Sequence, residues 1–285
     1  MKNSESVVIA GATGYLGNLL AHHYASCGFD LILIGRHENS LISLKIEIEN
    51  KFNIQITCIE LDFESDFSSV LSLEIGERIS NIHTFINTIG TQSPIAPILG
   101  TSFVAWEKGI QVNLVLPVNL ARFFGENFVK NGSGSIILLS GGGATTPRPN
   151  FSSYASAKAG LIRFVETFAL ELEGTRVRIN AIAPGVMPSK MMEEIVKISP
   201  LTAGKDEVSK AERSLDGRAW DPKQVLGLCD FLMSEKSKGI TGKLISAEWD
   251  NWSEWPQYVD ELRSSDLYTL RRITGRDRGQ TWGDN

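Results

Sequence analysis

A tyrosine and a lysine in this chain are spaced so that they could act together as an acid and a base. Tyr154 and Lys158 stand four residues apart, which on a helix places them on one face, about one turn apart. An ammonium beside a phenol stabilises the phenolate, so we expect a pKa for Tyr154 below its usual value of about 10. Such a tyrosine can pass a proton to or from a substrate oxygen.

A glycine-rich turn near the N-terminus predicts a dinucleotide site. The apolar run that ends at residue 10 is typical of a buried parallel strand, and leucines at helical spacing follow the turn. In that context Gly11 would make the tight turn, Gly14 would admit a pyrophosphate, and Gly17 would let the helix pack on the strand. The N–H groups and the dipole of the helix would bind the phosphates. An ordinary glycine-rich βα turn is the alternative.

The composition limits the class of protein. The chain has 285 residues, 42% hydrophobic and 21% charged, which is ordinary for a globular protein with a large core. Its net charge of −5 disfavours a nucleic-acid partner attracted by bulk charge. No apolar run approaches the roughly 20 residues of a membrane span, and we expect no signal peptide. Scattered cysteines and histidines without metal spacing favour a cytoplasmic protein with no metal site.

Apolar runs alternate with helical patterns along most of the chain, which predicts an α/β fold. The expected architecture is a Rossmann-like, doubly wound parallel sheet of about seven strands with helices on both faces. The predicted strands cover 6–10, 30–35, 54–61, 82–88, 135–140, 177–183 and 242–246. The predicted helices cover 15–27, 40–51, 65–79, 101–130 (broken near Gly109), 151–173 and 221–234. We expect a single domain over 1–285 with its core at 6–246.

Two segments depart from this alternation. Residues 186–220 are rich in Pro, Ser, Lys and Glu, with short helical stretches. An insert at the carboxyl end of a strand is typical of a binding loop or lid, so we expect a substrate loop there. The extension at 247–285 holds four tryptophans, Trp249, Trp252, Trp255 and Trp282. Disordered segments are poor in aromatic residues, so we expect this extension to be ordered.

Taken together, these motifs resemble those of the short-chain dehydrogenase/reductase family over residues 6 to about 246. The turn from Gly11 to Gly17 resembles the family's cofactor turn, and Asn87-Thr-Ile-Gly90 resembles its Asn-Asn-Ala-Gly motif. The pair described above matches the family's Tyr-x-x-x-Lys motif. The remaining likenesses are Asn113, which resembles a helix Asn that holds a relay water; Ser140, at the end of the fifth strand; and the segment 180–189, which resembles the loop that caps the nicotinamide.

The resemblance implies hydride transfer between a nicotinamide cofactor and a carbon that bears oxygen. Tyr154 would be the acid/base, Ser140 would hydrogen-bond the reacting oxygen, and Lys158 would hold the nicotinamide ribose. Asn113 would position a water, or alternatively would satisfy backbone groups at a helix bend. The residues that the resemblance assigns to the cofactor are Gly11, Thr13, Gly14, Tyr15, Leu16, Gly17, Arg36, Asp62, Phe63, Asn87, Thr88, Ile89, Gly90, Tyr154, Lys158, Pro184, Gly185, Val186 and Ser189.

Three features depart from the family pattern. The glycine-rich turn has the spacing of the extended branch, which includes sugar-nucleotide epimerases and dehydratases. The family's serine lies thirteen residues before the tyrosine, where this chain has Gly141, so Ser140 is one residue too far. Thr145, Ser152 or a backbone N–H of the glycine run are the alternative oxyanion donors. The chain also continues for almost forty residues beyond the last predicted strand.

The end of the second predicted strand favours NADP(H) over NAD(H). An acidic residue at that place would bind the adenosine ribose diol and repel a 2′-phosphate. Here Gly35 takes the acidic position and Arg36 follows it, and a guanidinium suits a phosphate dianion. An arginine stacked on the adenine of either cofactor is the alternative. Asp62 and Phe63 would contact the adenine.

Cationic residues outside these motifs indicate an anionic substrate. Arg148 precedes Tyr154 in a proline-rich loop, and Arg271 and Arg272 belong to a basic cluster in the extension. We therefore expect the extension to be a lid or clamp at the mouth of its own site or that of a neighbouring subunit, and the substrate to be a sugar phosphate or nucleotide sugar. A solvated, partly disordered terminus is the alternative for the basic cluster. An epimerase or dehydratase that retains its cofactor, or a non-catalytic cofactor-binding scaffold, are the alternatives. We also expect a homo-oligomer, a dimer or tetramer paired through helices at 111–130 and 151–173.

Overall fold

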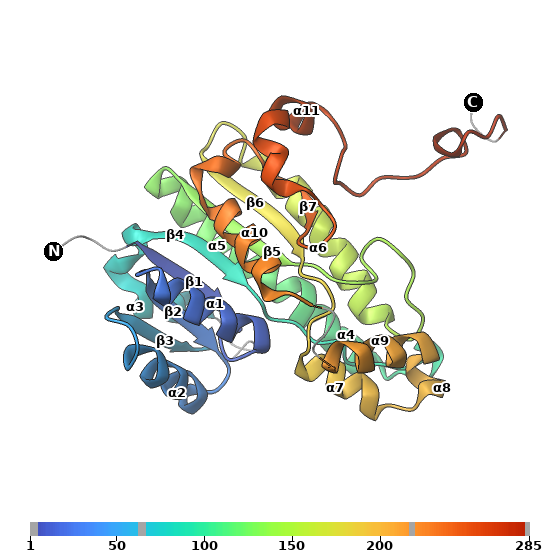
Figure 1. The fold of residues 1–285 in the computed structure, drawn as a ribbon, viewed down its shortest axis with the longest axis horizontal. Helices are drawn as coiled ribbons and strands as arrows, with labels where there is room; N and C mark the ends of the chain where they lie inside the picture. The colour runs from blue at the N-terminus through green and yellow to red at the C-terminus, as the bar shows by residue number, and fades with distance from the viewer. Residues whose placement is uncertain (1–4, 62–66, 217–219, 283–285) are drawn as a thin grey trace.

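The computed structural model describes residues 5–61, 67–216 and 220–282, and within them seven parallel strands form one sheet (Figure 1). The sheet order is β3-β2-β1-β4-β5-β6-β7, so the strand order reverses between β1 and β4. This confirms the predicted fold class. The strands are β1 (Ser6–Ala10), β2 (Asp30–Gly35), β3 (Ile56–Glu60), β4 (Ile82–Asn87), β5 (Gly134–Leu139), β6 (Val177–Ala183) and β7 (Leu244–Ser246).

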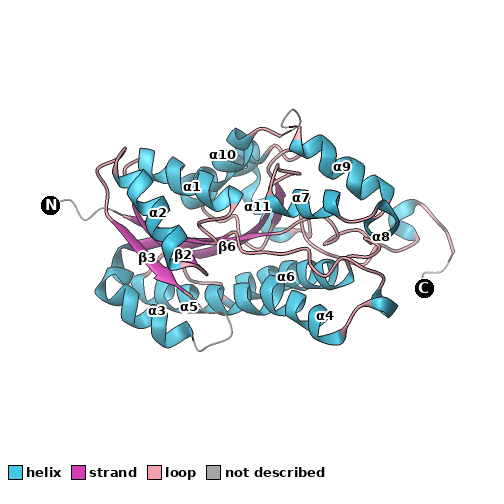
Figure 2. Ribbon diagram, turned by 90° about the horizontal axis from the view of Figure 1, so that it is seen from below, coloured by secondary structure: helices cyan, strands magenta, loops and turns pink. Residues whose placement is uncertain are grey.

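Helices cover both faces of the sheet (Figure 2). One face carries α1 (Tyr15–Ser26), α2 (Glu38–Glu49) and α10 (Pro222–Met233); the other carries α3 (Phe67–Ile75), α5 (Leu116–Asn131) and α6 (Ser152–Glu171). Successive side chains of a strand point to opposite faces. Accordingly, Val7 and Ile9 of β1 enter one hydrophobic core while Val8 and Ala10 enter the other. Burial on both faces explains the continuous apolar runs that predicted these strands.

A π-turn joins two helices where the sequence predicted a break. α4 (Phe103–Ile110) begins at Ser102, whose hydroxyl accepts the N–H of Ala105, and runs into the π-turn Gln111–Val115 and then α5. The interruption therefore follows Gly109 without ending the helix. Asn113 lies in this turn and is fully buried. Such turns widen a helix locally and are frequent at functional sites.

The insert after β6 forms three short helices, α7 (Lys190–Lys197), α8 (Pro200–Ala203) and α9 (Lys205–Leu215). Ile195, Val208 and Ala211 from these helices pack in a small core with Phe151 and Tyr154 at the start of α6. The insert is therefore seated on the helix that carries the predicted acid/base. A substrate-binding role for residues 186–220 stays a prediction.

The C-terminal extension packs against the core through two of its four tryptophans. The ring of Trp255 lies 4.3 Å from that of Tyr268, and the ring of Trp252 lies 5.5 Å from that of Phe231 on α10. Trp249 and Trp282 are instead exposed. After the 3₁₀ turn Trp252–Tyr258 and α11 (Val259–Ser264), the last stretch of the chain runs outward from the body (Figure 1).

Buried charges hold residues 265–270 of the extension in place. Lys243 donates to the carbonyls of Ser265 and Leu267 at 3.3 and 2.9 Å. Glu166 of α6 accepts the N–H of Leu270 at 2.6 Å, and Arg163 bonds both Glu166 and the Leu270 carbonyl. These contacts fasten the extension along α6, on the side of the body away from the insert.

Candidate active site

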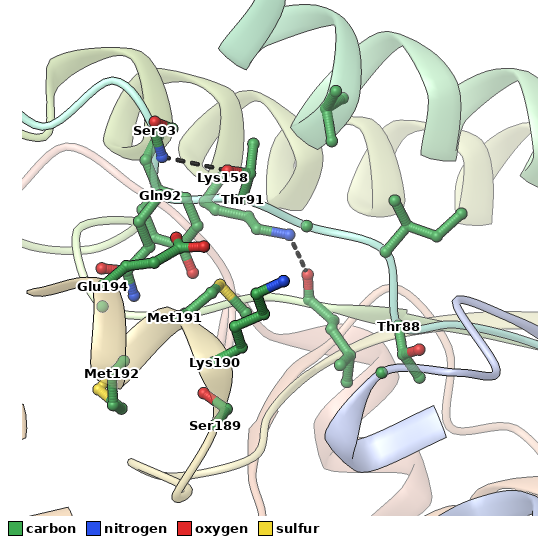
Figure 3. Close-up of a pocket in the computed structure, with 18 of the residues that line it drawn as sticks. Thr88, Thr91, Gln92, Ser93, Lys158, Ser189, Lys190, Met191, Met192 and Glu194 are labelled. Carbon is green, nitrogen blue, oxygen red and sulfur yellow. Dashed lines mark hydrogen bonds between the residues drawn. The ribbon is translucent and has the colours of Figure 1, made fainter. Parts of the chain in front are cut away.

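A cavity of about 930 Å³ opens at the carboxyl ends of the strands, where the strand order reverses between β1 and β4. Ligands of doubly wound folds bind at this place. The cavity is lined by the glycine-rich turn, the end of β2, the loops after β4, β5 and β6, α6 and the insert. In Figure 3, Lys158 enters from α6, Lys190, Met191 and Glu194 face it from α7, and Thr88 and Thr91 come from the loop after β4.

The glycine-rich turn suits a dinucleotide. Gly11 adopts φ +81°, and a Cβ there would lie 2.6 Å from the Thr88 hydroxyl. A Cβ on Gly17 would lie 2.2 Å from the Gly11 carbonyl, so the helix could not approach the strand this closely with any other residue. A Cβ on Gly14 would instead meet only the Gly11 carbonyl, at 3.2 Å, and would otherwise fill open space. Gly14 thus exposes its backbone to the cavity at the start of α1, where phosphates bind.

Most of the residues assigned to the cofactor line this cavity, and some do not. Gly17 and Asn87 lie behind its wall, Asn87 being fully buried. Asp62 and Phe63 fall outside the described residues, so their contact with the adenine stays a prediction. The cofactor residues that line the cavity are Gly11, Thr13, Gly14, Tyr15, Leu16, Arg36, Thr88, Ile89, Gly90, Tyr154, Lys158, Pro184, Gly185, Val186 and Ser189.

Tyr154 and Lys158 lie on one face of α6, as their spacing predicts, and both are nearly buried. The Lys158 ammonium donates to the Leu139 carbonyl at 2.7 Å and lies 5.8 Å from the centre of the Tyr154 ring. Burial lowers the pKa of Lys158 to about 8. Burial also raises the pKa of Tyr154, and the charge that opposes this is Arg148. The expected lowering of the Tyr154 pKa by Lys158 is therefore wrong for this structure, because desolvation of the phenolate outweighs the opposing charge, which is that of Arg148.

Asn113, in the π-turn, lies close to Lys158 and to the loop after β4. Its amide donates to the carbonyls of Thr91 and Gly109 and accepts the N–H of Thr91 at 3.1 Å. A Cβ on Gly90 would lie 3.2 Å from the Asn113 carbonyl oxygen and 3.9 Å from the Lys158 nitrogen. The structure therefore brings Asn113, Gly90 and Lys158 together. The side chain of Asn113 satisfies backbone groups here, which is the alternative role, and its part in a water relay stays a prediction.

Gly141 and the Tyr154 hydroxyl compete for one space. A Cβ on Gly141 would lie 2.1 Å from the Tyr154 hydroxyl oxygen, so a side chain at the family's serine position would displace that hydroxyl. Ser140 lines the cavity, but its hydroxyl has no hydrogen-bond partner among the described residues and so does not bond Tyr154. A buried hydroxyl without a partner is costly unless a ligand atom satisfies it.

The other hydroxyl candidates are placed less favourably. Thr145 is exposed and is not among the residues that line the cavity. The Ser152 hydroxyl already accepts the indole N–H of Trp106 at 3.1 Å. Gly141 and Gly142 line the cavity, so their backbone is available to a ligand. The structure leaves Ser140 and this glycine backbone as the candidates for the oxyanion donor.

Of the three predicted substrate residues, only Arg148 lies in the cavity. Its guanidinium stacks 3.7 Å from the centre of the Phe151 ring and contacts Gln92 and Glu207. Arg271 instead pairs with Asp266 and Asp277 within the extension, and no described residue of the extension lines the cavity. The expectation that Arg271, Arg272 and the extension form a lid is therefore wrong within one chain. The extension follows α10 and α6, where Trp252 and Trp255 can be buried.

Sequence reasoning missed several charged or polar residues that line the cavity. These residues lie in the loop after β4, in α4 and in the insert; they are Gln92, Lys108, Lys190, Glu194, Glu207 and Lys210. It also missed Trp220, whose indole donates to the Pro184 carbonyl at 2.6 Å and whose ring lies 5.8 Å from that of Tyr15. Charged and apolar residues alternate at helical spacing along the insert. This pattern indicates that one face of each helix is polar, but it does not indicate which part of the protein that face contacts.

A glycine-rich turn and a Tyr/Lys pair on one edge of a parallel sheet define a nicotinamide-dependent oxidoreductase. The family model for short chain dehydrogenases matches residues 5–199. The chain therefore belongs to the short-chain dehydrogenase/reductase family, whose members are NAD(P)-dependent. Among the described helices none is long and apolar enough to cross a membrane.

Named relatives show how varied the substrates of this family are. The chain is 28% identical over 184 residues to sulfoacetaldehyde reductase 2 of Chromohalobacter salexigens, covering 64% of this chain and 73% of that one. It is 31% identical over 195 residues to a benzil reductase of Bacillus subtilis, covering 67% and 78%. A short chain dehydrogenase from Shigella flexneri complexed with NADP superimposes with a TM-score of 0.73 at 21% identity, covering 86% and 97%.

Proposed function

We propose that this protein is an NADP(H)-dependent oxidoreductase that transfers a hydride between the nicotinamide and the carbonyl or hydroxyl carbon of a polar, anionic metabolite. One observation carries the proposal: a Tyr/Lys pair lies in a cavity whose charged lining residues are mostly cations. Its cations are Arg36, Lys108, Arg148, Lys158, Lys190 and Lys210, and its anions are Glu194 and Glu207. Sugar phosphates and nucleotide sugars remain the predicted substrates, and sulfoacetaldehyde, the substrate in the name of one relative, is also an anion.

The side chains of the cavity have the protonation states that carbonyl reduction needs. The bound nicotinamide would supply the hydride. Because burial raises the pKa of Tyr154, its phenol is protonated at neutral pH and can give that proton to the substrate oxygen. Lys158 remains cationic below its pKa of about 8, so at neutral pH its ammonium can donate hydrogen bonds to a bound ligand.

Arg36 supports the preference for NADP(H). It follows Gly35 at the end of β2, is exposed, and lines the same cavity as the glycine-rich turn. A guanidinium there can bind a 2′-phosphate by charge-assisted hydrogen bonds, while no carboxylate takes the place that would repel it.

Ser140 is our candidate for the group that hydrogen-bonds the reacting oxygen. Its hydroxyl is buried at the end of β5, lines the cavity and lacks a partner among the described residues. A ligand oxygen would satisfy it. The backbone N–H groups of Gly141 and Gly142 are the alternative.

The predicted homo-oligomer, the cytoplasmic location and the single domain over 1–285 are part of this proposal. Phe164 and Phe168 of α6 stack at 5.3 Å and are only partly buried, which suits a helix–helix contact between subunits. A light-scattering mass near the 31.3 kDa of one chain would contradict association.

The test is a screen for NADPH oxidation with phosphorylated sugars, nucleotide-linked keto-sugars and small acidic aldehydes and ketones. We expect stoichiometric oxidation of NADPH with at least one of them, and its loss in Tyr154→Phe. Conversion of a nucleotide sugar without net NADPH oxidation would favour an epimerase. A Tyr154→Phe variant with full turnover would contradict the assignment of the acid/base.

A further inference from the structure

Arg148 is held in the cavity by an acid from the insert. Its side chain is only 11% exposed, and its Nη2 donates to Glu207 on α9 at 2.6 Å and to Gln92 at 3.1 Å. The guanidinium lies flat on the Phe151 ring, with its carbon 3.7 Å from the ring centre. A cation with this many fixed contacts is oriented in advance for an anion that enters the cavity.

The same guanidinium lies beside the acid/base. Its carbon is 5.7 Å from the centre of the Tyr154 ring, and its charge lowers the pKa that burial raises. Arg148, Gln92, Glu207 and Tyr154 all line the one cavity. A molecule that places an oxygen at the Tyr154 hydroxyl and an anion at Arg148 therefore has only a few atoms between the two groups.

Glu207 has a second cation to which it can turn. Its other oxygen lies 3.7 Å from Lys210, whose side chain is 56% exposed. Glu207 itself is 21% exposed, so it lies between the buried Arg148 and the solvated Lys210. Leaving Arg148 would therefore not leave this carboxylate without a partner.

We propose that Glu207 occupies the place of the substrate's acid group, and that a carboxylate, sulfonate or phosphate of the substrate displaces it from Arg148. The substrate class is then an aldehyde or ketone, or the matching alcohol, whose acid group lies a few atoms from the oxygen-bearing carbon. This inference rests on the function proposed above, because it uses Tyr154 as the group that meets the reacting oxygen.

The exchange selects for charge. Replacing one anion by another leaves the nearly buried Arg148 paired, so no charge is stranded. A neutral substrate that took the same place would break the pair without replacing it, which discriminates against neutral carbonyl compounds. Between turnovers Glu207 keeps Arg148 paired, since an unpaired buried cation is strongly destabilising.

The test measures binding without turnover. Glycolate and glycolamide have the same size and differ in charge, and 2-hydroxyethanesulfonate adds a sulfonate. Each is titrated by calorimetry into the full-length protein saturated with NADP⁺. We expect the wild type to bind glycolate at least tenfold more tightly than glycolamide.

Four variants separate displacement from a general effect of charge. Glu207→Gln should tighten glycolate several-fold and leave glycolamide unchanged, because the competing carboxylate is gone. Arg148→Gln should abolish the preference for the acid, and Arg148→Lys should retain part of it. Glu194→Gln is the matched control, since it removes a carboxylate that lines the same cavity without contacting Arg148; we expect it to change glycolate affinity less than twofold.

The outcomes distinguish this inference from the proposed function. Equal affinity for glycolate and glycolamide, equal gains in Glu207→Gln and Glu194→Gln, or no binding of either acid at millimolar concentration would each overturn the displacement. If that happens while a neutral carbonyl compound oxidises NADPH, the proposed reaction stands and only the substrate class is wrong. An acid preference without NADPH oxidation by any carbonyl compound supports the anion site and contradicts the reaction.

Discussion

The insert at α7 to α9 and the C-terminal extension both interrupt the alternation of strands and helices, but among their described residues only those of the insert line the cavity. The insert follows β6, contributes Lys190, Glu194, Glu207 and Lys210 to the cavity wall, and packs on the start of α6. The extension follows β7 at the same edge of the sheet and then runs back along α10 and α6.

Hydrophobic burial explains this difference better than charge does. The arginines of the extension predicted a lid over the cavity, whereas its buried tryptophans determine where it lies. Trp255 is buried in the hydrophobic core shared by α1 and α10, and Trp252 packs, partly buried, on Phe231 of α10. Removing this apolar area from water stabilises the docked extension by several kcal/mol. Exposed ion pairs such as that of Arg271 with Asp266 contribute little.

The largest expected effect lies beneath the insert. Tyr154→Phe removes the proton donor but keeps the ring that packs with Ile195 and Val208, so the insert should stay in place. Turnover should fall by roughly 10²–10⁴-fold with cofactor affinity nearly unchanged. Single-turnover kinetics with bound NADPH check this. More than about a tenth of wild-type turnover would contradict the role.

The second largest effect is expected from Arg36, which lines the cavity at the end of β2. Arg36→Ala should weaken NADPH binding about 10- to 100-fold, because a charge-assisted contact is worth about 1.5–3 kcal/mol, and should weaken NADH far less. Equilibrium binding of the two cofactors measures this. Arg78, which bonds Thr57 far from the cavity, provides a control in Arg78→Ala. Equal losses of NADPH and NADH in Arg36→Ala would refute the phosphate contact.

Two buried lysines, Lys243 beneath the extension and Lys158 in the cavity, allow the stability contributions of these two regions to be compared. Lys243 holds the Ser265 and Leu267 carbonyls of the extension, so Lys243→Met should leave them unsatisfied and reduce the free energy of unfolding by about 1–3 kcal/mol. The KM of the carbonyl substrate should not change, since Lys243 does not line the cavity. Chemical denaturation and steady-state kinetics check both parts. A raised KM with unchanged stability would show that the extension serves the substrate.

Lys158, in the cavity, should make stability depend on pH. Its folded pKa of about 8 lies below its usual 10.5, so between these values the unfolded chain binds more protons and stability rises with pH. Relative to Lys158→Met, which lacks this group, the cofactor-free wild type should gain about 1–3 kcal/mol from pH 8 to pH 10. Below pH 8 the difference should be flat. A constant difference throughout the range would show that the Lys158 pKa is not lowered.

The smallest expected effect is that of removing the end of the extension. Residues 271–285 lie beyond the contacts of Leu270 with Arg163 and Glu166. Their deletion should change the KM of substrate and of NADPH by less than about twofold. KM rises when a residue that contacts the ligand is removed, and the described residues of this segment do not line the cavity. A large rise in the KM of substrate alone would instead show that arginines of this segment contact the substrate in the site of a neighbouring subunit.

Continuous apolar runs and local turn chemistry made most of the fold predictable. β1, β2 and β6 have the predicted bounds, because each is an apolar run closed by a turn. The Gly11–Gly17 turn and the Tyr154–Lys158 spacing are local features, so a motif is enough to find them. An interruption near Gly109 was predicted, but its form, the π-turn at Gln111–Val115, was not, because a single added residue in a helix has no clear periodic signal.

Charges that meet only in the folded chain could not be predicted. Arg148 and Glu207 are far apart in sequence, and nothing local indicates that α9 returns to the loop before α6. Nor does the sequence show that Tyr154 would be more influenced by desolvation than by Lys158. The clash between a side chain at position 141 and the Tyr154 hydroxyl likewise depends on the orientation of the Tyr154 ring in the folded chain.

The most direct test of the account is hydrogen–deuterium exchange with and without NADPH. We expect cofactor to slow exchange in peptides that cover residues 11–17, 88–93 and 184–197, since each of these segments contributes residues to the cavity wall. Peptides that cover residues 252–270 should exchange at the same rate in both states. Unchanged exchange at the glycine-rich turn, or equal protection of the extension, would contradict the conclusion that the insert, and not the extension, completes the site.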